Sequence, residues 1–299
     1  MIAVLGATGY VGRAISRALS AEGKQLALFA RNPEKLSGGA WPAGVTLRPL
    51  ASFDAAEFSL VINAVGAGDP KTVSSMGTGI IELTALWDQR VLATMGLETR
   101  YVFLSSGVVH GASQLIATPD DLKSLPAIPP QGLSPYTFSK LQAEHRHRQA
   151  RSRAILDLRI FGFADRAIDL AGSFFLAQLA NCIVQKAVFA TSKEDIVRDY
   201  SGIAELRALV DCWENAGAPN CALDLFTKSP ASKQNLLETF VKRYGLAIEY
   251  VADIEPSPTG VKPRYFSLDH AAARLGFAPT RDSLCVLTDT IDAILIGGK

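Results

Sequence analysis

The chain has 299 residues, of which 48% are hydrophobic and 20% are charged, so it can bury a sizeable core and is not an intrinsically disordered chain. Thirty basic and 29 acidic residues give a net charge of +1, which excludes the broad positive field of a protein that binds nucleic acid. The length suits one large domain with a smaller lobe.

Short apolar runs alternate with longer amphipathic segments over the first two-thirds of the chain. In chain order, strands are predicted at Ile2–Leu5, Gln25–Ala30, Thr46–Leu50, Leu60–Ala64, Tyr101–Ser105 and Leu156–Ile160, and helices at Val11–Ala21, Gly79–Met95 and Pro135–Ala150. Several of these strands are apolar on both faces, as in a sheet that helices cover on each side. The pattern predicts an α/β fold with a doubly wound parallel sheet of the Rossmann type.

Beyond Gly162 the alternation loosens, with one more strand expected at Ala222–Phe226 and a helix at Ser232–Tyr244. We interpret this part as a smaller, interleaved C-terminal substrate lobe. The expected dinucleotide-binding domain covers residues 1–162, with 203–228 returning to it, and the lobe covers 163–202 and 229–299. The basic run HRHRQARSR, residues 145–153, falls where a helix should end, so we interpret it as a solvated helix terminus.

The start of the chain, its apolar stretches, and its cysteines and histidines indicate where the protein is located and whether it binds a metal. The chain opens on MIAVLGATG, a strand that runs into a turn rather than a secretion signal, and no apolar stretch approaches the roughly 20 residues that span a bilayer. The four cysteines and four histidines show no metal-ligand spacing. We therefore expect a cytoplasmic protein without a metal, a membrane partner or a nucleic-acid partner.

Gly6, Gly9 and Gly12 stand in GATGYVG, directly after an apolar strand and at the start of an amphipathic helix. This is the setting of a dinucleotide-binding turn, in which glycines let backbone N–H groups approach a pyrophosphate at the positive end of the helix. We expect Thr8, Tyr10 and Val11 of the same turn to contact the cofactor. The alternative is a structural turn that binds no nucleotide.

The segment LFARNPEKL follows the second predicted strand and bears on the choice of dinucleotide. An acidic residue there would hold the ribose 2′-hydroxyl of NAD, but none is present at positions 29–32. Arg31 is instead placed to meet a 2′-phosphate, and Lys35 or Arg13 can assist it. The sequence therefore favours NADP over NAD. The alternative is that Arg31 is an exposed loop residue that does not contact the cofactor.

Tyr136 and Lys140 occur in PYTFSK, one helical turn apart, so their side chains can enter one pocket. A phenol is a poor acid–base catalyst at neutral pH, and a nearby ammonium lowers its pKa. Tyr136 can then exchange a proton with a carbonyl oxygen, while Ser106, at the end of a strand, hydrogen-bonds the same oxygen. For the Tyr-Lys spacing by itself, a pair on the helix surface is the alternative.

Taken together, these motifs resemble the extended short-chain dehydrogenase/reductase family of nucleotide-sugar epimerases, dehydratases and 4-keto reductases. The resemblance covers nearly the whole chain: GATGYVG, SSGVVHG and YTFSK match the family's glycine, serine and tyrosine–lysine motifs. It implies that Ser106, Tyr136 and Lys140 are catalytic, and that Tyr136 and Lys140 also contact the cofactor. VINAVG resembles the strand segment beside the cofactor, which implies contacts from Ala64, Val65 and Gly66.

The resemblance also implies how a substrate is bound. IVRDY resembles the segment whose arginine contacts the diphosphate of a nucleotide-linked sugar, so Arg198, together with Ser106, is expected to bind substrate. A structural pair between Arg198 and Asp199 is the alternative. The closing stretch PRYFSLDHAAARLGFAP resembles the family's C-terminal ending, and the family further implies a homodimer.

The sequence also departs from the family pattern in the region of the catalytic motifs. The asparagine usual before the serine strand is absent from ELTALWDQRV, and His110 stands where a tyrosine is usual. The primary hypothesis is an NADP-dependent oxidoreductase that reduces a keto group of a nucleotide-linked deoxysugar, with Tyr136 as proton donor. Alternatives are an NAD(P)-dependent nucleotide-sugar epimerase or dehydratase, a reductase of a non-sugar ketone, and a non-catalytic NADP-sensing protein.

Overall fold

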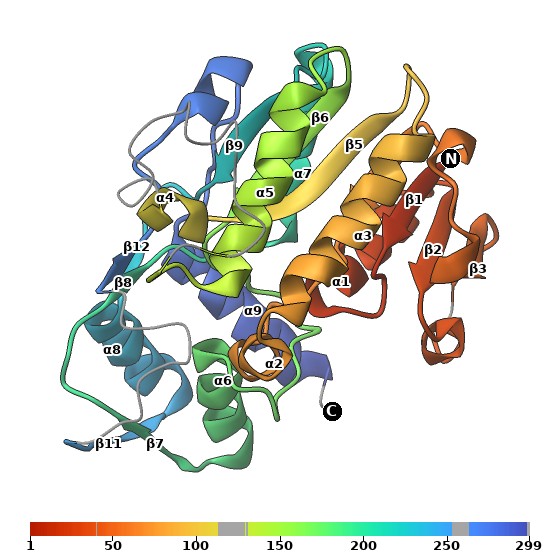
Figure 1. Ribbon diagram of the computed structural model, residues 1–299. Coiled ribbons are helices and arrows are strands. Elements are labelled where there is room, and N and C mark those ends of the chain that lie inside the picture. Colours follow the sequence, from red (N-terminus) through yellow and green to blue (C-terminus); the bar gives the residue numbers. More distant parts are fainter. Residues whose placement is uncertain (40, 113–128, 130, 253–262, 298–299) are drawn as a thin grey trace.

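A computed structural model describes residues 1–39, 41–112, 129, 131–252 and 263–297 (Figure 1). The strands of its largest sheet are β1 (Ile2–Leu5), β2 (Leu26–Ala30), β3 (Val45–Pro49), β4 (Leu60–Asn63), β5 (Arg100–Ser106), β6 (Ala154–Ile160) and β9 (Cys221–Leu225). The helices around this sheet are α1 (Tyr10–Ala21), α2 (Pro70–Met76), α3 (Gly79–Thr94), α4 (Val108–Ala112), α5 (Pro135–Gln149) and α7 (Ile203–Asn215). Short 3-10 turns occur at η1 (Pro33–Leu36), η2 (Leu50–Ser52), η3 (Ala55–Glu57) and η5 (Ala271–Leu275).

The seven strands pair in the order β3-β2-β1-β4-β5-β6-β9, and every pair is parallel. The order reverses at β1, where Leu5 lies between Phe29 of β2 and Asn63 of β4. Ligands of doubly wound sheets bind at such a reversal, beyond the carboxyl ends of the strands. The predicted Rossmann-type fold is confirmed, and the glycine turn follows β1 at the reversal.

Two apolar layers hold the sheet between helices. On one face, Ile15 and Leu19 of α1 and Leu209 of α7 pack against the strands. On the other face, Val91 of α3 and Ala143 of α5 do so, beside the aromatic residues of β2 and β5. Figure 1 shows α3 and α5 side by side along that second face. Because both faces are buried, β1 and β2 are apolar throughout, as the sequence indicated for several of the strands.

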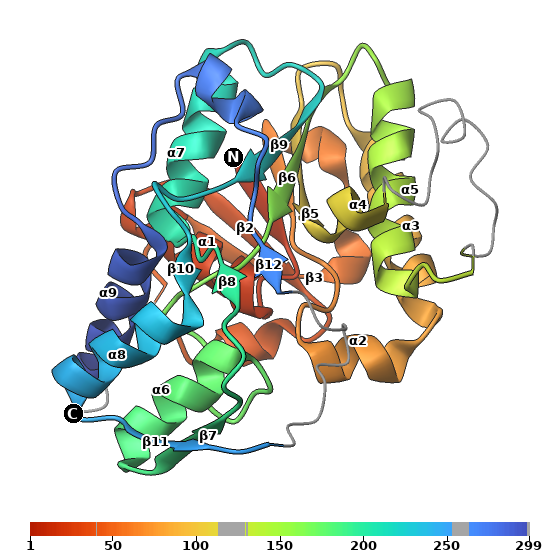
Figure 2. The same ribbon diagram turned by 90° about the vertical axis from the view of Figure 1, so that its left-hand side faces the viewer.

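A second body of structure lies beyond the carboxyl ends of the main strands (Figures 1 and 2). It contains α6 (Phe175–Gln185), α8 (Lys233–Tyr244) and α9 (Ser283–Gly297), which share an apolar core around Leu179, Phe240 and Leu287. Two small sheets join it, one with β10 (Ala231–Ser232), β8 (Val197–Arg198) and β12 (Arg264–Tyr265), the other with β11 (Ala247–Tyr250) and β7 (Val188–Thr191). We propose this body as the substrate lobe, with the boundaries predicted from the sequence.

The structure differs from the sequence-based expectations in two respects. Five of its helices were not predicted, namely α2, α4, α6, α7 and α9. The basic run 145–153 is not a simple solvated helix end: His147 is fully buried, although α5 does end nearby, at Gln149. Among the described residues, no helix has the length and hydropathy needed to cross a membrane.

Candidate active site

The glycine turn after β1 leaves an open cradle at the start of α1. Gly6 has a φ of +73°, in the left-handed region, and a Cβ there would lie 2.7 Å from the carbonyl oxygen of Ala64. A Cβ at Gly12 would lie 2.3 Å from the carbonyl oxygen of Gly6. The turn therefore excludes side chains at these positions, and its backbone can approach a ligand. Such a cradle at a helix N-terminus fits the diphosphate of a dinucleotide.

The end of β4 forms the next wall of the cradle. The Oδ1 atom of Asn63 accepts a hydrogen bond from the backbone N–H of Val65 at 3.0 Å, and its Nδ2 donates to the Tyr101 hydroxyl at 2.9 Å. The first bond holds the backbone at Val65, within the segment predicted to contact the cofactor, and the second holds the Asn63 side chain in place. Asn63 was not among the predicted site residues, although it stands within the VINAVG motif.

Tyr10, another predicted cofactor residue, uses its hydroxyl elsewhere. The hydroxyl lies 3.3 Å from the carbonyl oxygen of Phe163 and 3.2 Å from that of Asp165, and it accepts from the Asp165 N–H at 2.8 Å. Burial raises the pKa of Tyr10, so the phenol stays neutral. Its side chain thus ties the glycine turn to the segment that leads into the proposed substrate lobe.

Arg31 follows β2 directly, at the same edge of the sheet as the glycine turn. Its side chain is exposed, and it forms no salt bridge within the part of the chain that the structure describes. The nearby 3-10 turn η1 carries Lys35, which is exposed as well. Two cations without carboxylate partners therefore stand where the adenosine end of a dinucleotide would lie.

The start of α5 positions the predicted tyrosine and lysine. The Ser134 hydroxyl accepts a hydrogen bond from the Thr137 N–H at 3.1 Å, and Pro135 occupies the first helical turn, so the helix begins sharply. Tyr136 and Lys140 lie one turn apart, and the Nζ atom of Lys140 is 5.6 Å from the centroid of the Tyr136 ring. Lys140 is buried and donates to the carbonyl oxygen of Leu104 at 2.8 Å.

The environment shifts both pKa values. Burial lowers the pKa of Lys140 to about 8, against the opposing charges of Asp88, Glu144 and Asp157. Burial raises the pKa of Tyr136, and a hydrogen bond with Ser106 opposes that rise only in part. The expected lowering of the Tyr136 pKa is therefore not found in this arrangement, because burial raises the pKa and the effect that opposes it comes from Ser106. A neutral phenol is nevertheless the form that donates a proton.

Ser106 lies at the end of β5, in reach of two phenols. In addition to its hydrogen bond with Tyr136, its Oγ atom lies 3.1 Å from the hydroxyl of Tyr265. Tyr265 belongs to β12, and its ring packs on Phe161 with 5.1 Å between centroids. The structure thus brings Ser106, Tyr136 and Lys140 together and adds Tyr265. The PRYF motif was noted only as part of a C-terminal ending, because a two-residue strand leaves no periodic signal.

Arg198 lies beside Tyr265, with its guanidinium carbon 5.9 Å from the ring centroid. The proposed structural pair between Arg198 and Asp199 is wrong. The Asp199 carboxylate instead accepts hydrogen bonds from the hydroxyls of Thr227 at 2.6 Å and Ser283 at 2.8 Å. Arg198 is half-buried, donates to the carbonyl oxygen of its neighbour Val197, and has no salt bridge among the described residues. No carboxylate among the described residues therefore matches its charge.

A polar chain runs from the serine strand to the rim of the site. The Ser105 hydroxyl donates to Glu144 at 2.6 Å, and Glu144 accepts from Arg159 at 2.6 Å. On the other side of Arg159, the buried carboxylate of Asp224 contacts the Nε2 atom of His110 at 2.8 Å. His110, which stands where the family pattern has a tyrosine, is thereby held at the start of the segment after Ser106.

Comparison with known proteins identifies the family. A family model described as "NAD dependent epimerase/dehydratase family" matches residues 2–161, which is more than half of the chain. The chain belongs to this family. The resemblance to extended short-chain dehydrogenases is thereby confirmed, and the protein is an enzyme of the NAD(P)-dependent oxidoreductase type.

Several known proteins are similar to this family member. A dTDP-6-deoxy-L-talose 4-dehydrogenase (NAD(P)(+)) from Kitasatospora kifunensis is 26% identical over 300 residues, which cover 94% of this chain and 91% of that protein. Among solved structures, a UDP-N-acetylglucosamine 4-epimerase from Methanobrevibacter ruminantium superposes with a TM-score of 0.79 at 13% identity, covering 100% of this chain and 98% of that one. MoeE5 in complex with UDP-glucose and NAD gives a TM-score of 0.73 at 19% identity, with coverages of 100% and 99%. Structural likenesses at this level of identity show the shared fold.

A buried charged cluster lies on the same helix, α5, as the candidate catalytic residues Tyr136 and Lys140 of this family member. His147 of α5 lies between two carboxylates, 2.6 Å from Asp88 of α3 and 2.5 Å from Asp157 of β6, and all three are fully buried. Burial alone would lower the pKa of His147, but Asp157 and Asp88 together raise it to about 9. Arg146 and Arg148 add ion pairs to the two carboxylates. The cluster joins α3, α5 and the sheet, and so fixes the helix that carries Tyr136 and Lys140.

Proposed function

We propose that this enzyme is an NADP-dependent reductase that converts a keto group of a nucleotide-linked deoxysugar into an alcohol. The observation that carries the proposal is the convergence of Ser106, Tyr136 and Lys140 at the carboxyl edge of the sheet, beside the glycine cradle. The similarity to a dTDP-6-deoxy-L-talose 4-dehydrogenase supports a deoxysugar carrying a nucleotide as the substrate.

The residues of the site support a simple division of labour. NADPH, bound above Gly6–Gly12, would supply the hydride that reduces the carbonyl carbon. Tyr136 donates its phenolic proton to the carbonyl oxygen, and Ser106 donates a hydrogen bond to the same oxygen. Lys140, held on the Leu104 carbonyl, stabilises the phenolate that remains and can share its proton with it. One hydride on carbon and one proton on oxygen complete the alcohol.

Binding residues complete the proposal. Arg31 supports NADP, because a guanidinium without a carboxylate partner suits a 2′-phosphate at the end of β2. Arg198 favours a substrate that carries a diphosphate. It is half-buried and lies beside Tyr265, whose hydroxyl contacts Ser106. We further propose contacts of Thr8, Tyr10 and Val11 with the cofactor, a cytoplasmic location, and a homodimer formed through α3 and α5.

An epimerase is the second candidate, because a solved structure similar in fold is a UDP-glucuronic acid 4-epimerase bound to NAD. The same three catalytic residues could oxidise a sugar transiently and return the hydride to it. Such an enzyme consumes no cofactor overall, whereas a reductase consumes one NADPH for each product molecule.

The test follows NADPH absorbance with a panel of nucleotide-linked 4-ketosugars. We expect stoichiometric loss of NADPH and formation of the 4-hydroxy sugar, with Tyr136→Phe as the inactive control. Interconversion of two nucleotide sugars without net loss of cofactor, by a protein that retains NAD through purification, would instead assign the epimerase reaction.

A further inference from the structure

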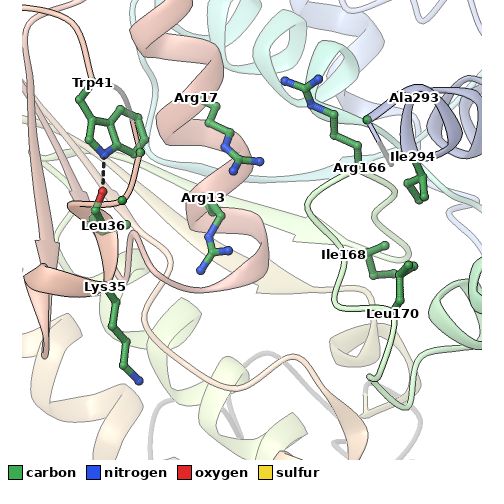
Figure 3. A pocket seen from close by; sticks show the side chains of 13 residues that line it. Arg13, Arg17, Lys35, Leu36, Trp41, Arg166, Ile168, Leu170, Ala293 and Ile294 are labelled. Carbon is green, nitrogen blue, oxygen red and sulfur yellow. Dashed lines mark hydrogen bonds between the residues drawn. The ribbon is translucent and has the colours of Figure 1, made fainter. Parts of the chain in front are cut away.

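A cavity of about 680 Å³ lies on the flank of α1, away from the catalytic residues (Figure 3). Its walls are α1, the turn η1 with the loop after it, residues 166–170 that follow β6, and the end of α9. The residues that line it are Arg13, Arg17, Lys35, Leu36, Gly38, Gly39, Trp41, Arg166, Ile168, Leu170, Ala293, Ile294 and Gly297. We call this the basic cavity. Its volume lies within the range of roughly 300–1,000 Å³ that is usual for small-molecule sites.

The side chains that line the basic cavity carry positive charges that no acidic lining residue balances. Four cations line it, namely Arg13, Arg17, Lys35 and Arg166, and no lining residue is acidic. None of the four forms a salt bridge within the described parts of the chain, and among their side chains only that of Arg13 donates a hydrogen bond there, to the Thr8 carbonyl at 3.2 Å. Elsewhere in the described residues, eight arginines form salt bridges with carboxylates, as Arg159 does with Glu144.

This concentration of charge indicates an anionic ligand. Like charges that converge on one hollow raise each other's energy, and an anion relieves that repulsion. Guanidinium groups bind phosphate oxygens through paired, charge-assisted hydrogen bonds. Arg13 and Arg17 lie one turn apart on the same face of α1, and Arg166 lies across the cavity from them (Figure 3).

The dinucleotide accounts for only part of this charge. Arg13 follows Gly12, and Lys35 belongs to the turn after Arg31, so both lie close to the expected adenosine phosphate of the cofactor. Arg17 follows Arg13 by four residues, so it lies one helical turn, about 6 Å, farther along α1 from the glycine turn. Arg166 belongs to a different segment altogether, beside the apolar residues Ile168 and Leu170. Arg17 and Arg166 are therefore cations that the cofactor leaves unmatched.

The cavity also offers an aromatic and an apolar wall. The Trp41 indole is held in place by a hydrogen bond from its Nε1 atom to the Leu36 carbonyl at 2.8 Å. Figure 3 shows Trp41 on one side of the cavity, with Ile168, Leu170 and Ile294 on the other. A nucleobase can stack on an indole face in a manner that tolerates different bases.

We propose that the basic cavity binds a nucleoside diphosphate as a second ligand, separate from the dinucleotide and from the substrate. Arg17 and Arg166 bind the phosphates, and Trp41 packs on the base. Occupancy of the cavity would place a ligand across η1, α1 and α9, and so would connect the wall of the cofactor site to the proposed substrate lobe. The proposal holds whichever sugar the enzyme reduces.

Calorimetric titration of ADP into the 299-residue protein saturated with NADP⁺ tests the proposal. We expect one ADP to bind, with Arg17→Gln and Arg166→Gln each weakening the affinity about tenfold, as the loss of a charge-assisted hydrogen bond predicts. Trp41→Ala should weaken ADP about fivefold or more and leave the affinity for inorganic pyrophosphate unchanged. Arg151→Gln, which removes an exposed arginine outside the cavity, is the matched control and should leave ADP affinity unchanged.

Three results would each overturn the assignment. ADP that binds the free protein but not the NADP⁺-saturated protein would show that the cavity belongs to the cofactor. ADP binding that depends on Arg198→Gln but not on Arg17→Gln or Arg166→Gln would place the ligand in the substrate site. Absence of ADP binding, with all variants folded by circular dichroism, would show that solvent alone compensates the cations.

Discussion

The hydroxyl of Tyr265 lies 3.1 Å from Oγ of Ser106, although the two residues are 159 positions apart in the chain. Burial raises the pKa of Tyr265, so its phenol is neutral and can donate to the serine oxygen. A serine that accepts this bond keeps its own proton for the substrate oxygen, and each bond in such a chain strengthens the next. Tyr265 also lies between Phe161 and Arg198, so it connects the serine to the proposed diphosphate clamp.

Tyr265→Phe should therefore lower kcat about tenfold, because one hydrogen bond to the serine is lost. NADPH affinity should stay within about twofold of the wild type, since Tyr265 does not line the glycine cradle. Steady-state kinetics and a fluorescence titration with NADPH provide the two measurements. Tyr250→Phe, at an exposed tyrosine on β11, is the matched control. Unchanged kcat in Tyr265→Phe would rule out this role.

Tyr136→Phe removes the proposed proton donor while keeping the ring beside Lys140. We expect kcat to fall by about 10²- to 10⁴-fold, the usual contribution of general acid–base catalysis. The affinity for NADPH should change little, as measured by the same fluorescence titration. Lost NADPH binding with unchanged turnover of the bound fraction would contradict the role assigned to the phenol.

Arg31→Gly tests which dinucleotide the site prefers. If the guanidinium meets a 2′-phosphate, the affinity for NADPH should fall about tenfold or more while that for NADH stays nearly constant, because NADH carries no charge at that position. Dissociation constants for both cofactors measure this directly. Lys24→Gln, at an exposed cation outside the site, serves as the control. An equal loss of affinity for NADPH and NADH would mean that Arg31 does not bind the 2′-phosphate.

His147 should make the stability of the fold depend on pH. Its pKa is raised to about 9 in the folded protein, against about 6.5 in an unfolded chain, so its contribution is complete below pH 6.5 and is lost as pH rises toward 9. Between pH 6.5 and 8 the free energy of unfolding should fall by about 1.5 kcal/mol. Urea denaturation at several pH values measures this change.

Two variants separate His147 from other titrating groups. His147→Gln should lower stability at pH 6.5 by about 3 kcal/mol or more, because Asp88 and Asp157 then face each other without the cation, and should remove the pH dependence. His145→Gln, two residues away and only partly buried, should keep the wild-type dependence. A pH profile that survives His147→Gln would assign the dependence to another group.

The amino-acid sequence by itself determined the sheet and the glycine turn, and it indicated the three residues that we propose as catalytic. Strands buried on both faces are continuously apolar, and the turn and the tyrosine–lysine pair depend on spacings within a few residues, so each leaves a local signal. The observed strands agree closely with the predicted ones, as at β9, which begins at Cys221 where Ala222 was expected. Asn63 could have been predicted from the sequence in the same way, since it stands inside the VINAVG motif.

Only the tertiary structure decided which distant residues meet. Tyr265 reaches Ser106 because β12 pairs with β8 at the end of the main sheet, and no local pattern records that pairing. His147 looked like part of a solvated basic run, because hydropathy cannot distinguish a charge in water from one buried between two carboxylates. The basic cavity, likewise, exists because α1 and residue Arg166 lie opposite each other. Contacts between residues far apart in the chain depend on how whole elements pack, and that packing is not encoded in any short stretch of sequence.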